Sequence, residues 1–333
     1  MQHTIQLLRD ALSTQYDARE VKAQIRLLLE EVCGLSYTQI VMADYRSVTP
    51  DQRERLARCA EPLSRGIPVQ QVLGYAWFRG RRFGVNEHVL IPRPETAELV
   101  DLIVSDFAAK EVAGPVDKPV NKPVENGADT PLDNPVHNLL DIGTGSGCIA
   151  LSLAADIHRS LITAADISTE ALITAKNNAN ALGINNVRFV QADILKEATE
   201  DFCTELSTLP GDNDEVPTAP RSAQYDAIVS NPPYICQRER VDMSANVLDH
   251  EPHLALFVPD SDPLLFYRTI GQYALRHLRP GGRLYFEINA AYGAETCDLL
   301  RSLGYTEVEL RQDMEGRDRM VRARLDNRDI IPL

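Results

Sequence analysis

With 333 residues, the chain is long enough for two domains, and its 44% hydrophobic and 25% charged residues have the balance of an ordinary soluble protein. Its net charge of −14 opposes tight binding to a long phosphate backbone, so we expect no direct nucleic-acid partner. No apolar run approaches the ~20 residues of a membrane span, and the N-terminus lacks the features of a secretory signal. We therefore expect a cytoplasmic protein without a membrane partner, and a monomer by default.

The cysteines and histidines give no sign of a metal site. The six cysteines form no CxxC pair, and the seven histidines form no HExxH or comparable group. We expect reduced thiols and no metal.

The first 73 residues predict a small helical bundle. Apolar residues repeat at helical spacing in residues 5–12 and 21–32. A further helix begins at the Thr-Pro-Asp sequence of residues 49–51, which supplies an N-cap, a proline at the first helical position and an early acid, and Gly66 ends it. This region carries no catalytic signature, so a recognition or docking role and a stabilising cap are equally open.

Residues 74–92 predict a β-hairpin that links this bundle to the rest of the chain. Apolar and polar positions alternate there around Gly80 and Gly84. The IPRPET sequence that follows, at residues 91–96, predicts a proline-bounded loop that leads into a helix.

From residue 138 onward, strand patterns alternate with helix patterns. This alternation indicates an α/β fold with a doubly wound, mainly parallel sheet. The tail predicts two strands around a turn at Gly316-Arg317, which form an antiparallel edge pair. Two polar, proline-containing segments, 110–137 and 197–223, predict insertions that bury little apolar surface, and we assign them no function.

The clearest binding signal is the DIGTGSG sequence. A hydrophobic strand ends at Asp141, and Gly143, Gly145 and Gly147 precede a helix, so the backbone can approach a ligand closely beside free N–H groups. We expect this whole loop, Thr144 included, to contact a cofactor. A tight strand-to-helix turn without a ligand is the alternative.

Acids end the next two predicted strands. Asp166 lies roughly 20 residues past the glycine loop, where an acid can accept hydrogen bonds from both ribose hydroxyls, and Asp193 can accept one from an adenine amine. A helix N-cap is the alternative for Asp166, although Ser168 can serve as the cap instead. Because the carboxyl ends of parallel strands meet at one edge, we expect an adenosine pocket there. The GxGxG spacing and the lack of a phosphate-binding lysine motif favour S-adenosylmethionine over ATP or NAD.

The reaction is indicated by Asn231-Pro232-Pro233-Tyr234, which follows the next strand. Methyl transfer to an amide or aryl amine nitrogen is difficult because the lone pair is delocalised. The side-chain carbonyl of Asn231 and the backbone carbonyl of Pro232 can accept the hydrogens of such an NH₂ group, the latter because Pro233 has no N–H to compete. Tyr234 offers a face to a planar group, so most of the rate is expected from positioning. We expect Asn231, Pro232 and Tyr234 to be catalytic, and Asn231 to contact the cofactor as well; an ordinary proline-rich turn is the alternative.

Several segments together resemble the HemK/PrmC family, the protein-(glutamine-N5) methyltransferases of peptide chain release factors. They lie between about residues 66 and 325 and read PVQQVLGYAWFRGRRFGVNEHVLIPRPETAELV, DIGTGSGCIALSLA, SNPPYI, EPHLALF, LRPGGRLYFEI and DMEGRDRMVRARL. IPRPET with NPPY at this separation is specific to the family, whereas either motif alone is not.

The resemblance implies a helical substrate-recognition domain at residues 1–73, a hairpin linker at 74–92 and a class I methyltransferase (Rossmann-like) domain at 93–333. It implies S-adenosylmethionine as the cofactor, S-adenosylhomocysteine as the product, and the glutamine of the release factors' GGQ loop as the substrate. Residue by residue, it assigns the cofactor to Gly143, Gly145, Asp166 and Asp193, and the substrate to Asn231, Pro232, Pro233, Tyr234, Pro92, Arg93, Pro94, Glu95 and Thr96.

The chain departs from the family pattern at Asn289, which follows Glu287-Ile288 where members often have glycine. Three other functions remain to be weighed. A DNA or RNA amino-methyltransferase shares the NPPY motif, but the acidic balance opposes it. A non-catalytic adenosine-binding module is disfavoured by the intact NPPY, and a nicotinamide dehydrogenase by the glycine spacing.

Overall fold

The computed structural model describes residues 1–113, 137–197 and 224–326. The two segments predicted as insertions, 110–137 and 197–223, therefore lie outside the described residues except at their ends. Within the part that is described, no helix combines the length and the apolar character needed to cross a bilayer.

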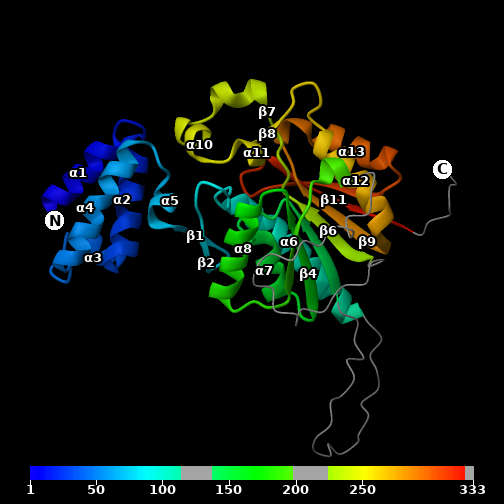
Figure 1. Ribbon diagram of the computed structural model, residues 1–333, viewed down its shortest axis with the longest axis horizontal. Coiled ribbons are helices and arrows are strands. Elements are labelled where there is room, and N and C mark those ends of the chain that lie inside the picture. Colours follow the sequence, from blue (N-terminus) through cyan, green and yellow to red (C-terminus); the bar gives the residue numbers. More distant parts are fainter. Residues whose placement is uncertain (114–136, 198–223, 327–333) are drawn as a thin grey trace, which may run out of the picture.

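The N-terminal region is a helical bundle at one end of the molecule (Figure 1). Its helices are α1 (Gln2–Leu12), α2 (Ala18–Cys33), α3 (Tyr37–Val41), α4 (Pro50–Ser64) and α5 (Val69–Leu73). The predicted cap is confirmed: the Thr49 side chain accepts from the backbone N–H of Gln52, with Pro50 at the first position. Leu8, Leu28 and Leu56 are fully buried between the helices. The short helices α3 and α5 were not predicted, because five residues are too few to show a period.

The β-hairpin that follows is shorter than the sequence predicts. It consists of β1 (Tyr75–Phe78) and β2 (Arg81–Gly84), and the residues from Val85 to Arg93 form no strand. The indole N–H of Trp77 donates a 2.8 Å hydrogen bond to Glu31 of α2, and the hydroxyl of Tyr75 bonds to the same carboxylate. The hairpin is thereby attached to the bundle.

The rest of the described chain builds a seven-stranded sheet in the order β10-β11-β9-β6-β3-β4-β5. Strands β9, β6, β3, β4 and β5 are parallel, whereas β11 and β10 pair antiparallel at one edge. The predicted fold class, including the antiparallel edge pair, is confirmed. The strand bounds are β3 His137–Ile142, β4 Ser160–Asp166, β5 Val187–Gln191, β6 Tyr225–Ser230, β9 Leu278–Glu287, β10 Thr306–Gln312 and β11 Asp318–Arg324.

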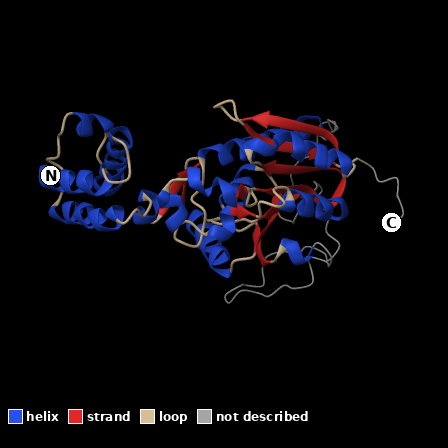
Figure 2. Cartoon of the chain, turned by 90° about the horizontal axis from the view of Figure 1, so that it is seen from above, coloured by secondary structure: helices blue, strands red, loops and turns tan. Residues whose placement is uncertain are grey.

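Helices cover both faces of this sheet (Figure 2). Neighbouring residues of a strand point to opposite faces, so Leu139 packs with α6 and α7 while Leu140 packs with α12 and α13. The helices are α6 Pro94–Ala113, α7 Cys148–Asp156, α8 Thr169–Leu182, α9 Ile194–Glu197, α12 Leu265–His277 and α13 Gly293–Ser302. The smaller elements are β7 Ile235–Cys236, η1 Gln237–Asp242, α10 Ala245–His250, α11 His253–Leu256, β8 Phe257–Val258 and η2 Ala290–Tyr292.

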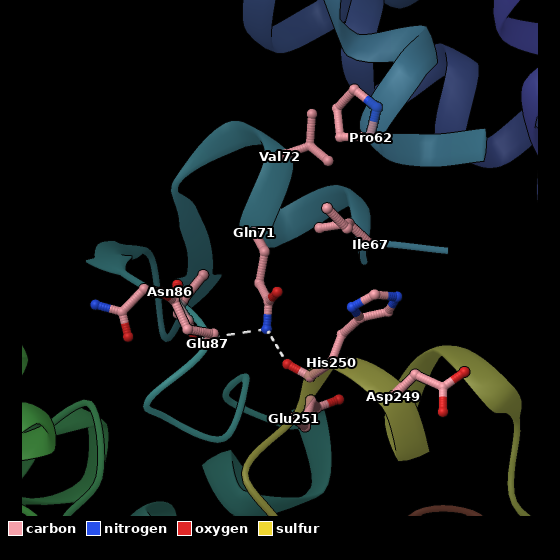
Figure 3. Close-up of a pocket in the computed structure, with 10 residues that line it drawn as sticks. Pro62, Ile67, Gln71, Val72, Asn86, Glu87, Asp249, His250 and Glu251 are labelled. Carbon is pink, nitrogen blue, oxygen red and sulfur yellow. Dashed lines mark hydrogen bonds between the residues drawn. The ribbon is translucent and has the colours of Figure 1, made fainter. Parts of the chain in front are cut away.

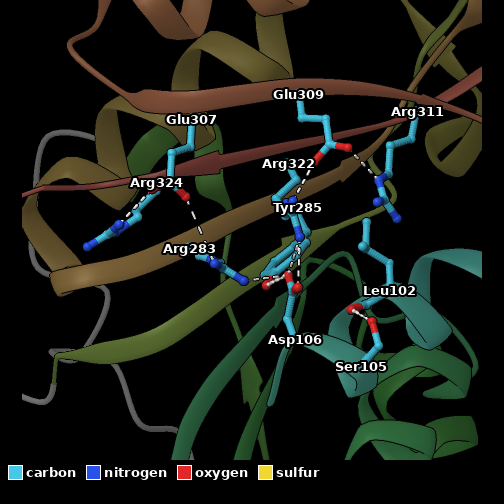
Figure 4. Close-up of polar contacts among 10 residues, drawn as sticks. All are labelled: Leu102, Ser105, Asp106, Arg283, Tyr285, Glu307, Glu309, Arg311, Arg322 and Arg324. Atoms are coloured by element: carbon cyan, nitrogen blue, oxygen red, sulfur yellow. Dashed lines mark hydrogen bonds and ion pairs between the residues drawn. The ribbon is translucent and has the colours of Figure 1, made fainter. Parts of the chain in front are cut away.

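Charged side chains tie α6 to the antiparallel edge (Figure 4). Asp106 of α6 accepts from Arg322 of β11 at 2.7 Å and from the hydroxyl of Tyr285 of β9 at 2.7 Å, and it pairs with Arg283 at 2.7 Å. Three donors around one carboxylate fix the helix on the sheet more firmly than an isolated surface pair would.

Candidate active site

A cavity of about 250 Å³ opens at the carboxyl ends of β3, β4, β5 and β6. These strands are neighbours in the sheet. β4 and β5 follow β3 on one side, whereas β6, which comes later in the chain, lies on the other side of β3. Such a switch point is where open α/β sheets bind ligands. The lining includes seven of the predicted site positions, on four different loops: Gly143, Gly145, Asp166, Asp193, Asn231, Pro232 and Pro233.

The glycine turn lets the backbone reach this cavity. Gly145 has φ +55° and nothing within 4 Å of where a Cβ would stand, so its missing side chain leaves the cavity open. Gly147 also has a positive φ, +80°, but a Cβ there would approach Ala175 Cβ to 3.1 Å. Gly147 therefore serves the packing of α7 against α8, not the cavity.

Asp166 shapes the same turn. Its carboxylate accepts the backbone N–H of Gly145 at 2.8 Å and that of Ser168 at 2.9 Å. Burial raises the pKa of this carboxyl, and the backbone hydrogen bonds oppose the rise. Ser168 caps α8 by accepting from the backbone N–H of Ala171, so Asp166 is not the helix cap. Asp166 lines the cavity instead.

Three loop residues do not line the cavity, contrary to the expectation that the whole loop would face a ligand: Asp141, Thr144 and Gly147. Asp141 is fully buried beneath the turn, where it accepts from the hydroxyl of Thr144 at 2.7 Å and from the N–H of Ala150 at 3.2 Å. Burial raises the pKa of Asp141 to about 7. The hydrogen bond between Asp141 and Thr144 supports the glycine loop from the core side, because Asp141 belongs to strand β3 and its side chain points into the core.

A second cavity, of about 240 Å³, lies on the other side of the NPPY turn. Arg93, Tyr234, Met243 and Val247 are among its lining residues. Both cavities are lined by Leu90, Asn231, Pro232 and Ala255. The Asn231-Pro232 segment is therefore a wall that the two adjoining cavities share.

Two predicted site residues, Thr96 and Tyr234, bond to a buried carboxylate, Glu287, that was not predicted as part of the site. The hydroxyl of Thr96 donates to Glu287 at 2.6 Å, the hydroxyl of Tyr234 donates to the other oxygen of Glu287 at 3.1 Å, and the side-chain amide of Asn231 donates to Thr96 at 3.4 Å. Glu287 is 1% exposed, and burial raises its pKa. The sequence signal that could have indicated Glu287 is its position as an acid at the end of the hydrophobic strand sequence LYFE.

The comparisons with known proteins agree with this geometry. Residues 2–74 match the family described as PrmC N-terminal domain, and residues 134–298 match the family described as methyltransferase domain. The release factor glutamine methyltransferase of Bacteroides thetaiotaomicron is 38% identical over 95% of this chain and 97% of its own length. The one of Flavobacterium psychrophilum is 36% identical over 94% and 95%, and that of Chlorobaculum tepidum is 35% identical over 90% and 89%. This chain belongs to the release factor glutamine methyltransferase family.

The IPRPET loop of this family member is held by a residue that we did not predict. Glu251 accepts from the guanidinium of Arg93 at 2.6 Å and from the backbone N–H of Ile91 at 3.2 Å. Arg93 lines the second cavity, whereas Pro92, Pro94 and Glu95 line neither cavity. Thr96 is buried and lines neither cavity, and its hydroxyl oxygen accepts from Asn231.

Asn289 also supports the NPPY turn. Its side-chain amide donates to the backbone carbonyl of Tyr234 at 3.0 Å and to Glu239 at 3.1 Å. In this family member a side chain thus fixes the end of the turn.

Proposed function

We propose that this methyltransferase transfers a methyl group from S-adenosylmethionine to the side-chain amide nitrogen of the glutamine in the GGQ loop of peptide chain release factors. The observation that carries the proposal is the pair of cavities that share Asn231 and Pro232. A methyl donor in the first cavity and a planar amide in the second would meet at that wall. The names of the curated relatives support the choice of acceptor.

The residues of the first cavity fit the proposed cofactor. Ile194, Phe266 and Ile270 give it an apolar side suited to an adenine ring. Asp166 and Asp193 supply carboxylates for hydroxyl and amine hydrogens, and Gly143 and Gly145 leave room for the amino acid part of the donor. S-adenosylmethionine, when bound, supplies an electrophilic methyl group on a positively charged sulfur.

The chemical task of the chain is to orient the acceptor. In our proposal the Asn231 side-chain carbonyl and the Pro232 backbone carbonyl accept the two hydrogens of the glutamine amide, and Tyr234 lies against its plane. With S-adenosylmethionine bound, the amide nitrogen oriented in this way would accept its methyl group, leaving S-adenosylhomocysteine, and would lose one proton. Neither carbonyl is a base, so that proton passes to water. Orientation and proximity supply most of the rate.

The same proposal assigns roles to the parts of the chain. We propose that residues 1–73 recognise the release factor, residues 74–92 link the two parts, and residues 93–333 carry out the methyl transfer. The match of residues 2–74 to a family-specific N-terminal domain favours recognition over a stabilising cap. Because its proposed substrate acts on the ribosome, we place the enzyme in the cytoplasm.

Methyl transfer from labelled S-adenosylmethionine to a purified release factor tests the proposal. The wild-type factor and a factor whose GGQ is changed to GGA are compared, and we expect label on the wild type alone, as N5-methylglutamine. Asn231→Ala is expected to lose turnover while keeping much of the cofactor affinity. Label on DNA or RNA and on neither factor would instead establish the nucleic-acid reaction.

A further inference from the structure

The side-chain amide of Asn231 ends a chain of hydrogen bonds with a fixed direction. Glu287 is the final acceptor, because it receives both the Thr96 hydroxyl and the Tyr234 hydroxyl. The single proton of Thr96 is committed to Glu287, so its oxygen can only accept from Asn231. The group that faces Thr96 must therefore be the NH₂ of Asn231, as the 3.4 Å contact has it.

The direction of these hydrogen bonds corresponds to the ionised form of Glu287, which some of its neighbours favour and others oppose. Arg319 of β11 favours the ionised form of Glu287, and Arg319 is itself held by Asp313 at 3.1 Å. Thr96 and Tyr234 act in the same sense, whereas burial, the largest influence, raises the pKa of Glu287, and Glu95 adds to that rise. An ionised carboxylate can accept two hydroxyl protons but can donate none.

We propose that Thr96 and Glu287 are positioning residues that set which end of the Asn231 amide faces the acceptor glutamine. With the NH₂ group turned toward Thr96, the Asn231 carbonyl oxygen is left to accept from the substrate. The reverse orientation would place the Asn231 oxygen against an oxygen with no proton to give, and it would present a donor to the substrate NH₂. This inference rests on the proposed function, since it assumes that Asn231 accepts from a substrate amide.

The arrangement predicts different results from two threonine substitutions. Thr96→Val keeps the shape but removes the hydroxyl, so either orientation of Asn231 becomes possible, and we expect kcat to fall roughly 10- to 100-fold while the KM for S-adenosylmethionine changes less than about threefold. Thr96→Ser restores the hydroxyl and should restore most of kcat. Glu287→Gln replaces one acceptor oxygen by an NH₂ group; where that group faces Thr96, the Thr96 proton is released toward Asn231, so kcat should fall to a value between those of Thr96→Val and the wild type.

Thr296→Val is the matched control. Thr296 is also buried and also donates from its hydroxyl, to the backbone carbonyl of Tyr292 at 2.7 Å, but it lies on α13 away from both cavities. Its loss should leave kcat near that of the wild type.

The experiment measures kcat and both KM values on a purified release factor, together with melting temperatures. Wild-type kcat in Thr96→Val, or no recovery in Thr96→Ser when both variants melt like the wild type, would overturn the inference. If Thr96→Val does not fold, the kcat values of Thr96→Ser and Glu287→Gln are compared instead. An equal loss of kcat in these two variants would show that Thr96 and Glu287 have a structural role and would overturn the inference. Absence of glutamine methylation by the wild type would instead refute the proposed function.

Discussion

The carboxylate of Glu251 accepts a 2.6 Å hydrogen bond from Arg93, and only 1% of the Glu251 side chain is exposed. The same carboxylate accepts the backbone N–H of Ile91. One buried acid at the start of EPHLALF therefore holds the IPRPET loop, which lies far away in the sequence. Since Arg93 lines the second cavity, this contact shapes the space proposed for the acceptor glutamine.

Removing the Glu251 carboxylate should weaken both stability and substrate binding. Glu251→Ala leaves a buried N–H without a partner and an arginine without its counter-charge, and we expect a loss of about 2–4 kcal/mol in the free energy of unfolding. Urea unfolding measures this. Glu251→Gln keeps an acceptor for Ile91 and should lose less.

Glu54→Ala provides the comparison for that loss. Glu54 and Arg58 form an exposed pair at 3.0 Å on α4, with side chains 69% and 66% exposed. Removal of this exposed ion pair should change the free energy of unfolding by less than about 0.5 kcal/mol. Equal losses in Glu251→Ala and Glu54→Ala would show that the Arg93 contact stabilises little.

Much of this site could be predicted because it is written in adjacent residues. The glycine turn, the strand-end acids and the NPPY turn each lie at the end of a hydrophobic strand, and a parallel sheet brings such ends together. The side of the strand that a residue faces is harder to predict. Asp141 was expected at the cavity, but it points into the core because it belongs to the strand and not to the turn.

The supporting residues could not be predicted, because their partners lie far away in the sequence. Glu287 and Thr96 are 191 residues apart, and Glu251 and Arg93 are 158 residues apart. Nothing local distinguishes Glu251 from a surface acid, and the strand-end position of Glu287 does not show which donors the fold will bring to it. The hairpin was predicted too long for a related reason: the alternating pattern continues past Gly84, but the residues that follow turn toward Glu251.

Hydrogen bonds connect the helical bundle to the segment beside the site. Gln71 of α5 donates to the backbone carbonyl of His250 at 2.8 Å, next to Glu251, across a cavity of about 480 Å³ (Figure 3). If residues 1–73 recognise the release factor, Gln71→Ala should raise the KM for that factor several-fold and leave the KM for S-adenosylmethionine unchanged. Steady-state kinetics with each substrate varied in turn measures both.

Gln70→Ala is the control for the coupling. Gln70 is the neighbouring residue of the same helix and does not line the cavity between the bundle and the sheet domain. Its kinetics should match the wild type. A Gln71→Ala enzyme with wild-type KM for the release factor would show that this bond does not hold the bundle in its working position.

Asp141 should make the stability of the ligand-free enzyme depend on pH. Its pKa in the folded state is about 7, above the ordinary 3.8, so between about pH 4 and pH 7 the folded state keeps a proton that the unfolded state has released. The free energy of unfolding therefore falls as the pH rises through this window, by at most about 4 kcal/mol in total. In Asp141→Asn the fall should be smaller by this contribution, leaving the part due to Asp166 and Glu287, whose pKa values burial also raises, whereas Asp242→Asn, at an exposed aspartate, should keep the whole fall. Urea midpoints at pH 5, 6 and 7.5 test this, and a wild-type slope in Asp141→Asn would contradict it.

Alanine substitutions at three glycines distinguish the effects of backbone strain, of overpacking and of lost space for a ligand. Gly183 caps α8 with φ +67° and open space around it, so Gly183→Ala should cost about 1 kcal/mol of stability through strain alone. Gly147→Ala adds contacts of 3.1 Å to Ala175 and Leu151, and it should cost about 2–4 kcal/mol.

Gly145→Ala has strain and open space like Gly183, but its methyl group would enter the cavity. We expect it to melt like Gly183→Ala and yet to bind S-adenosylhomocysteine at least about tenfold more weakly, since uncompensated overlap with a ligand costs more than 1.4 kcal/mol. Calorimetric titration with S-adenosylhomocysteine measures this, and wild-type affinity in Gly145→Ala would show that the ligand does not lie against the turn.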